Sequence, residues 1–190
     1  MVKAILDGKK TMTRRVIKPQ PIDVIPMTDI KDGWVALIET NPNRGKWIKC
    51  RYGQVGDRLW VRETWWTPPH NKIDKNPAIV SYKEIIYSSI GGDATDRNRW
   101  YPSIFMPRWA SRITLEITDI RVERLQEITE EDAKDEGIKV IDKTPDGMYS
   151  PPNYPDIHRD IFIGLWDSLN AKYRWESNPF VWCISFKKLD

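Results

Sequence analysis

The chain has very few of the residues that form disulfide frameworks and metal sites. Its 190 residues include two cysteines, Cys50 and Cys183, and two histidines, His70 and His158. The cysteines lie far apart in the sequence, and the histidines share no helical spacing. The sequence therefore predicts a protein of a reducing compartment, with neither a disulfide scaffold nor a dedicated zinc site.

Long apolar runs are missing as well. No stretch approaches the length of a membrane span, no internal repeat or low-complexity tract is present, and no signal peptide opens the chain. These absences predict a cytoplasmic protein with no membrane partner.

The net charge is only +3, so the distribution of charge is more informative than its sum. Basic residues gather in three stretches, at 3–18, 44–62 and 97–112, and the balancing acids gather at 127–136. A basic face with one acidic corner is typical of a nucleic-acid-binding protein. Solvated charges on ordinary surface strands explain the same pattern equally well.

The most distinctive stretch runs from Gly8 to Arg15 and reads GKKTMTRR. A short helix is predicted before it, over Val2–Asp7, with Gly8 as a left-handed cap. The alternation that follows predicts a strand with Thr11, Thr13 and Arg15 on one side. An amine, a hydroxyl and a guanidinium on a helix-to-strand turn can receive an anion or activate a nucleophile. The alternative is an ordinary basic helix end that complements the helix dipole.

The first half of the remaining chain reads as strands and loops. A hairpin is predicted from Trp34–Ile38, a turn at 41–43 and a return over Lys46–Cys50. A turn at 53–57 leads into a strand over Arg58–Glu63. A further short strand is predicted at Ala78–Tyr82, inside an irregular segment.

The second half holds the clearest elements. A long strand is predicted over Ile113–Leu125, with a β-bulge near Thr118 where the apolar phase slips. Thr129–Asp132 resembles a capping box that opens a helix ending at Glu136 and Gly137. Another predicted helix has one apolar face, formed by Ile161, Phe162, Leu165, Trp166 and Leu169. The last strand, Phe180–Phe186, is predicted to be buried on both sides.

About six short strands with three helices predict an α+β fold built on a small mixed barrel. The length predicts a single domain over 1–190. Long loop insertions are predicted at about 19–50, 64–106 and 139–158, where prolines are frequent.

Several of these motifs together resemble the ASCH family. The matching parts are Gly8–Arg15, Gly56–Leu59, the strand Ile113–Leu125, Ala133–Gly137, and the closing helix and strand. Arg58–Trp65 and Pro107–Ile113 are most similar to ASCH proteins of tailed phages and prophages, which are often labelled morphogenetic. The resemblance implies a PUA-like β-barrel.

The resemblance also implies a cleft with a lysine, a threonine and an acid, which here are Lys10, Thr13 and Glu136. Small bacterial ASCH proteins with this set are amidohydrolases that remove the acetyl group from N4-acetylcytidine. Other members are reported as ribonucleases, and related PUA-like barrels bind modified bases. In this chemistry Lys10 would be the base, Thr13 the nucleophile or its positioner, and Glu136 the acid. Lys9, Arg14 and Arg15 would lower the pKa of Lys10.

Basic and aromatic residues are candidates for contacts with substrate or nucleic acid. Arginines interleaved with exposed aromatic rings are suited to stack on unpaired bases. Most of the ten tryptophans are nevertheless expected in the core, with Trp60 and Trp109 facing the cleft. The predicted binding residues are Lys9, Arg14, Arg15, Trp60, Arg62, Arg108 and Trp109.

The sequence thus predicts a protein acting on a nucleoside or nucleic-acid base, without metal or organic cofactor. Its concrete form is hydrolysis of an N-acyl amide on a base such as N4-acetylcytidine. Two alternatives stay open: a non-catalytic module that holds RNA or a modified base in a phage context, and a ribonuclease using the same cleft.

Overall fold

The computed structural model describes residues 1–24, 34–38, 45–66, 86–87, 100–140 and 155–189, with the backbone alone at 34–47 and 86–87. These residues group into two compact units. The first contains the described parts of Lys3–Asp57 and Glu116–Lys187, and the second those of Arg58–Leu115. We describe each unit by itself, and the expectation of a single domain stays a prediction.

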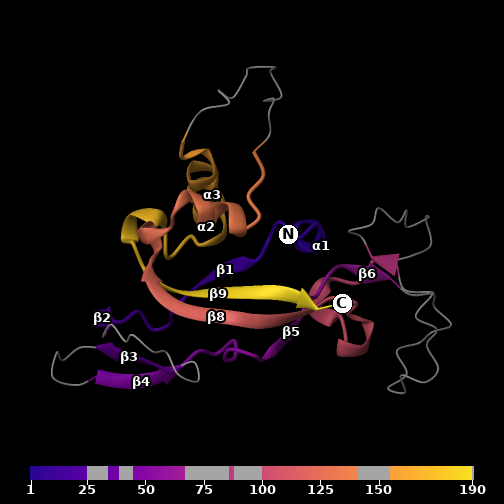
Figure 1. The fold of residues 1–190 in the computed structure, drawn as a ribbon, viewed down its shortest axis with the longest axis horizontal. Helices are drawn as coiled ribbons and strands as arrows, with labels where there is room; N and C mark the ends of the chain where they lie inside the picture. Colours follow the sequence, from indigo (N-terminus) through magenta and orange to yellow (C-terminus); the bar gives the residue numbers. More distant parts are fainter. Residues whose placement is uncertain (25–33, 39–44, 67–85, 88–99, 141–154, 190) are drawn as a thin grey trace. The chain divides into compact units, whose positions relative to one another are not determined.

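The first unit is built on long antiparallel strands. Strand β9 (Phe180–Leu189) lies between β1 (Met12–Val16) and β8 (Thr114–Arg124), and β8 and β9 curve together (Figure 1). In the β1–β9 pair, Thr13 lies opposite Ile184 and Arg15 opposite Trp182. A second sheet consists of β2 (Asp23–Val24), β3 (Trp34–Ile38) and β4 (Gly45–Lys49).

Three helices accompany the sheet in the described residues: α1 (Val2–Leu6), α2 (Glu130–Asp135) and α3 (Ile157–Leu169). Helices α2 and α3 pack on β9 through a buried apolar cluster. Two 3-10 turns flank these elements, η6 (Leu125–Glu127) and η7 (Trp175–Ser177). The cluster consists of Leu125, Ile128, Ala133, Phe162, Trp166, Val181 and Cys183.

The second unit contains short elements around an aromatic core. Strand β5 (Arg58–Trp60) lies beside the start of β8, and the Val61 amide donates to the Ile113 carbonyl at 3.0 Å. Strands β6 (Trp65–Trp66) and β7 (Ile86–Tyr87) pair, and two 3-10 turns follow, η4 (Ser103–Phe105) and η5 (Arg108–Ala110).

Most of the predicted elements are confirmed. The hairpin is formed by β3 and β4, with Trp34 opposite Lys49. The phase of β8 slips at Thr118 and Asp119, which are both exposed, and Phe180–Ile184 is buried throughout. The strand predicted over Arg58–Glu63 is shorter and ends at Trp60. The turn at 41–43 and the strand at 78–82 lie outside the described residues.

The predicted α+β class is confirmed, while the PUA-like barrel stays a prediction. The registered strand pairs are antiparallel, whereas the sequence predicted a mixed barrel. The reason is visible where β8 ends, since the Leu125 amide donates to the Pro179 carbonyl just before β9 begins. The chain therefore enters β9 at the end where it leaves β8.

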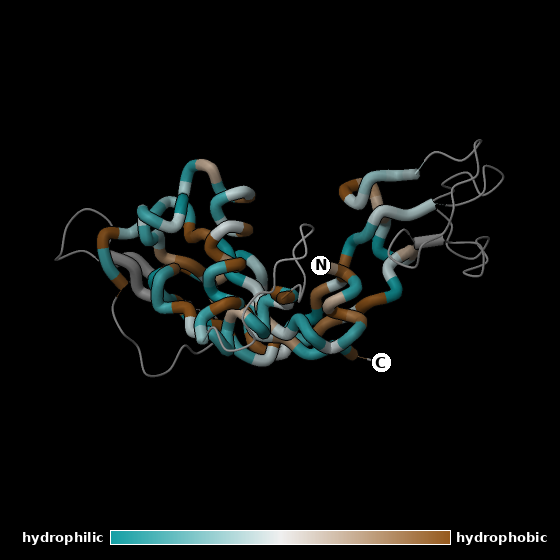
Figure 2. The backbone as a smooth tube through the Cα atoms, turned by 90° about the horizontal axis from the view of Figure 1, so that it is seen from above, coloured by the Kyte–Doolittle hydropathy of each residue, from teal (hydrophilic) through white to brown (hydrophobic). Residues whose placement is uncertain are grey.

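Hydrophobic residues occur in short runs separated by hydrophilic ones along the backbone (Figure 2). Within the part of the chain that the structure describes, no helix has the length and apolar character needed to cross a bilayer.

Candidate functional site

Lys10 and Glu136 meet although 126 residues separate them in the chain. After α1, Gly8 takes a left-handed backbone conformation with φ of 68°. The chain then pairs with the end of α2, where the Thr11 amide donates to the Asp135 carbonyl at 2.9 Å. Lys10 Nζ donates to Glu136 Oε2 at 2.6 Å, to the Glu136 carbonyl at 2.7 Å and to the Met12 carbonyl at 2.9 Å. All three ammonium hydrogens of Lys10 are thus used.

Helix α2 sets the position of Glu136. The predicted capping box is present, because the Thr129 hydroxyl accepts from the Asp132 amide and the Asp132 carboxylate accepts from the Thr129 amide. Glu136 is the C-cap residue, and its Oε1 accepts from the Arg14 amide at 2.5 Å. Gly137 follows with φ of 77°, and a Cβ there would lie 2.8 Å from Lys10 Cβ. A glycine is therefore needed for α2 to approach Lys10 this closely.

The surroundings of Lys10 favour a neutral amine more than water does. Burial lowers the pKa of Lys10 below its ordinary value of 10.5, Glu136 opposes this shift, and Arg15 and Arg14 add to it. The sequence assigned the shift to neighbouring cations including Lys9, whereas burial is the main cause. The side chain of Lys10 is only 5% exposed, which explains the dominance of desolvation.

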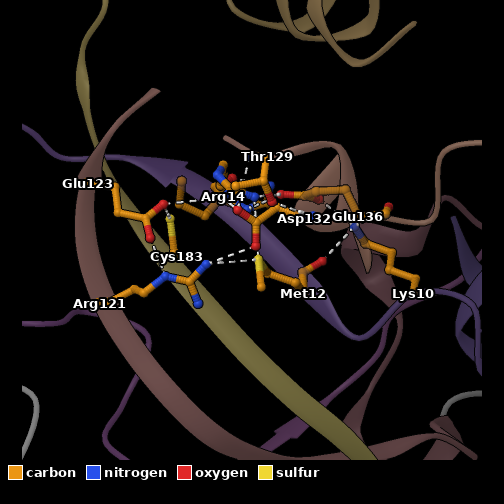
Figure 3. Close-up of polar contacts among 10 residues, drawn as sticks. Lys10, Met12, Arg14, Arg121, Glu123, Thr129, Asp132, Glu136 and Cys183 are labelled. Carbon is orange, nitrogen blue, oxygen red and sulfur yellow. Dashed lines mark hydrogen bonds and ion pairs between the residues drawn. The ribbon is translucent and has the colours of Figure 1, made fainter. Parts of the chain in front are cut away.

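Arg14 holds the acidic side of the site together (Figure 3). Its guanidinium is fully buried and lies 2.9 Å from Asp132, 3.2 Å from Glu123 and 3.9 Å from Glu136. The side chain predicted as a ligand contact is therefore occupied by three carboxylates. It positions α2 against β1.

Two further groups complete this network. Arg121 contacts Glu123 and donates to Asp132 at 3.0 Å. Cys183 Sγ donates to Glu123 at 3.2 Å, and burial raises the pKa of this thiol well above its ordinary value. Cys183 is therefore a buried, protonated donor in the network.

A pocket of about 490 Å³ opens beside the Lys10–Glu136 pair, and we call it the Lys10 pocket. Thr13 lines it, and the Thr13 hydroxyl oxygen is buried with no hydrogen-bond partner among the described residues. Strand β1, the end of α2, the apolar side of α3 and a turn at 51–52 supply its walls. The lining residues are Met1, Lys10, Thr13, Arg14, Arg15, Val16, Lys18, Arg51, Tyr52, Glu136, Gly137, Ile138, Phe162, Leu165, Trp166, Leu169 and Asn170.

The other predicted binding residues divide between places. Arg15 is exposed at the Lys10 pocket, where its Nη1 donates to the Arg14 carbonyl at 3.0 Å. Lys9 is exposed and lines a different hollow, together with Lys134 and Lys139. The structure thus brings Lys10, Thr13, Glu136 and Arg15 to one pocket and leaves Lys9 outside it.

The four remaining candidates gather in the second unit. The Arg62 guanidinium lies 4.7 Å and that of Arg108 5.9 Å from the centre of the Trp60 ring. Trp109 meets the buried Trp65 edge to face at 6.0 Å. Two guanidinium groups therefore lie near the Trp60 ring, which forms an aromatic platform between basic side chains.

The expectation that most tryptophans are in the core is wrong for the described side chains. Trp65, Trp166 and Trp182 are buried, whereas the other described tryptophans are half-buried: Trp60, Trp66, Trp100, Trp109 and Trp175. Their ring edges stay accessible at the surface, as amphipathic aromatic residues often do.

Sequence reasoning predicted few of the residues that line the Lys10 pocket. Leu165 and Leu169 were placed on one apolar helix face, and they are 46% and 67% exposed at the pocket. Helical spacing finds such a face but does not distinguish a core from a pocket wall. Lys18, Arg51 and Tyr52 carry no sequence signal, because they reach the pocket through the path of the chain.

Comparisons of the chain with protein-family models, with curated proteins and with solved structures find no match. Among the residues that the structure describes, no group of three or more His, Cys, Asp or Glu side chains is arranged to hold a metal ion. The argument for a function therefore rests on the geometry and the charges of the Lys10 pocket.

Proposed function

We propose that this chain is an ASCH-type protein with a PUA-like barrel that acts on a nucleoside or nucleic-acid base in the Lys10 pocket. The reaction is hydrolysis of the amide of an N-acylated base, most concretely N4-acetylcytidine, without metal or organic cofactor. The place of action is the cytoplasm, or the host cytoplasm if a phage encodes the chain.

The observation that carries this proposal is the Thr13 hydroxyl. Its oxygen is buried without a hydrogen-bond partner in the described part of the chain, and it lies in the wall of the pocket that also contains the Lys10–Glu136 pair. A buried hydroxyl without a hydrogen bond is costly, so its retention suits a role with a bound ligand. The same pocket is lined by Lys10, an amine of lowered pKa, and a hydroxyl with a base in one site is what nucleophilic catalysis uses.

The Lys10–Glu136 contact supports the acid and base roles. Transfer of one proton across the 2.6 Å contact produces a neutral amine and a protonated carboxyl together. The amine takes the proton of the attacking oxygen, which belongs to Thr13 or to a water that Thr13 positions. The carboxyl then gives its proton to the departing amino nitrogen as the C–N bond breaks. Acetate and cytidine are the products. If Thr13 itself is acylated, cytidine leaves first, and water then hydrolyses the Thr13 ester to release acetate and restore the hydroxyl.

A second candidate function is a binding module without catalysis. The specific observation that favours it is the complete use of the Lys10 hydrogens, together with the acceptance of hydrogen bonds by both Glu136 oxygens. Such a pair can serve to hold α2 against β1. In that case the pocket receives RNA or a modified base and releases it unchanged.

Hydrolysis of N4-acetylcytidine by the purified protein tests the first function. We expect turnover by the intact chain and a loss of about 100-fold or more in Thr13→Ala, because a nucleophile or its positioner is removed. Thr11→Ala is the matched control, since Thr11 directly precedes β1 and is not a lining residue of the pocket. Equal rates in the two variants, or no turnover by the intact protein, would favour the binding module.

A further inference from the structure

Three cations of the Lys10 pocket have no carboxylate partner among the described residues. Arg15, Lys18 and Arg51 line the pocket and are exposed. Among the described residues none of these three forms an ion pair with a carboxylate. Glu136 is the acid of the lining, and it is already paired with Lys10. The pocket therefore has an excess of positive charge on accessible side chains.

Two of these cations are supported in place by aromatic rings. Lys18 Nζ lies 5.5 Å from the centre of the Tyr173 ring, and the Arg51 guanidinium lies 5.8 Å from that of Tyr52. The turn that carries Arg51 is closed by the Gly53 amide, which donates to the Cys50 carbonyl at 3.3 Å, and the next turn is fixed to β8, where the Gly56 amide donates to the Ile117 carbonyl at 2.8 Å. A cation that is held before binding loses less side-chain entropy when it meets an anion.

Another part of the pocket lining is apolar. Helix α3 contributes Phe162, Leu165, Trp166 and Leu169, and Val16 and Ile138 adjoin them. Leu165 and Leu169 remain accessible in a pocket that also has cationic side chains. One wall thus suits a flat apolar group such as a base, and the cations suit an anionic group joined to it.

We infer that the Lys10 pocket is a nucleotide site, which takes a nucleoside monophosphate in preference to the uncharged nucleoside. Arg15, Lys18 and Arg51 bind the phosphate, and the apolar wall of α3 receives the base. The volume of about 490 Å³ is in the range of small-ligand sites. This inference rests on the proposed function for the nature of the ligand as a base, and it does not depend on hydrolysis.

Equilibrium binding by titration calorimetry tests the preference, with each common ribonucleoside measured against its 5′-monophosphate. We expect the monophosphate of at least one pair to bind about tenfold or more tightly, as hydrogen bonds to charged groups predict. Arg51→Gln and Lys18→Gln should each remove most of this difference. Lys3→Gln is the matched control, because Lys3 is exposed on α1 and is not a lining residue.

The outcomes separate this inference from the proposed function. Equal binding of nucleoside and monophosphate, no binding of either, or an unchanged preference in both pocket variants would overturn the nucleotide site. A short single-stranded RNA that binds tenfold more tightly than every monophosphate would overturn a monomeric ligand in favour of a polymer. Failure to hydrolyse N4-acetylcytidine or its 5′-monophosphate, with the phosphate preference intact, would remove the amidohydrolase activity and leave the nucleotide site in place.

Discussion

Gly137 determines how closely the end of α2 can approach Lys10. Its backbone has φ of 77°, and the space where a Cβ would lie is already taken by Lys10 Cβ and by Ala4 Cβ at 3.1 Å. The same backbone conformation occurs at Gly8, with φ of 68° and open space around it. Replacement of Gly8 thus measures the cost of a left-handed backbone alone, whereas replacement of Gly137 adds the cost of a steric clash.

We expect Gly137→Ala to lower the free energy of unfolding by about 2–3 kcal/mol, because a left-handed alanine is strained and the Lys10 side chain must move. Gly8→Ala should cost about 1 kcal/mol, since its strain is conformational alone. Urea unfolding of the two variants measures the difference. Equal losses would mean that the contact with Lys10 is relieved by a small shift of α2.

The lowered pKa of Lys10 gives the proposed reaction a pH dependence. The proposed reaction needs a neutral Lys10 and a protonated Glu136 together, so the pair must hold one proton, and kcat/KM should fall as pH rises through the pKa of Lys10, at a pH below the ordinary 10.5. Lys10→Arg should remove this limb, because a guanidinium stays protonated in the accessible range. A pH–rate profile of both proteins checks this. A fall that persists in the arginine variant would assign the limb to another group.

At the residue scale the sequence predicted candidate residues of the pocket, but it did not predict the contacts between them. The stretch Gly8–Arg15 supplied Lys10, Thr13 and Arg15, and the family resemblance added Glu136. No spacing rule joins residues 10 and 136, since their contact depends on how α2 returns to β1. Arg14 shows most clearly what the sequence could not predict. The strand pattern correctly placed Arg14 and Arg15 on opposite sides of β1. The partners of Arg14 are carboxylates and not a ligand, because α2 packs beside it.

At the scale of elements, α2 caps the helix that follows it in the unit. Glu130 accepts from the amides of His158 and Arg159 at 3.1 and 2.9 Å, and its carboxylate also contacts the His158 ring. Burial raises the pKa of Glu130, but the two amides and His158 outweigh it, and the net shift is below the ordinary 4.5. An ionised carboxylate thus satisfies the first amides of α3.

We expect Glu130→Gln to lower the free energy of unfolding by about 1.5–2 kcal/mol at pH 7, because the hydrogen bonds to a charged acceptor are weakened. A lowered pKa stabilises the folded state above the unfolded value of about 4.5, and this contribution is lost as pH falls through the folded value. The difference from the parent should therefore shrink below pH 4.5. Denaturation curves at pH 7 and pH 4 measure it.

Glu131→Gln provides the control for this prediction. Glu131 stands on the same helix, is 81% exposed and pairs with Lys134 at 3.2 Å. Exposed pairs of this kind contribute less than about 1 kcal/mol. A loss at Glu131 as large as that at Glu130 would show that helix charge, and not the cap of α3, is responsible.

Local signals predicted elements well where backbone chemistry decides them. The capping box at Thr129 and the glycine at 137 fixed both ends of α2, and the phase slip at Thr118 is present in β8. Phe162 and Trp166 on the predicted apolar face of α3 are buried, whereas Leu165 and Leu169 on the same face are exposed. A hydrophobic period reports which side is apolar, and the neighbouring elements decide whether that side is covered.

At the scale of the whole molecule, the α+β class followed from the alternation of strand and helix patterns. The division into two units did not, because it depends on which long-range contacts gather together. The predicted binding residues also divide along this line, with Lys10, Thr13, Glu136 and Arg15 in one unit and the Trp60 cluster in the other.

This division allows the polymer-binding alternative to be tested separately from the pocket. If single-stranded RNA stacks on Trp60, Arg62→Gln and Arg108→Gln should each weaken its binding and reduce the slope of log affinity against log salt by about one. Arg58→Gln, exposed in the same unit, is the control. Fluorescence anisotropy at several salt concentrations measures both quantities, and equal effects in all three variants would indicate a diffuse charge effect without a platform at Trp60.

The ion-pair network of Lys10, Arg14 and Arg121 with Glu123, Asp132 and Glu136 joins β1, β8 and α2. Removal of one member leaves its partners with buried, uncompensated charge, which costs about 3–5 kcal/mol for a buried pair. In evolutionary terms these positions are epistatic, because the cost of a change at one depends on the residues at the others. Drift through single replacements is therefore obstructed, and we expect diverging lineages of this chain to replace these charges in compensating pairs or to retain them all.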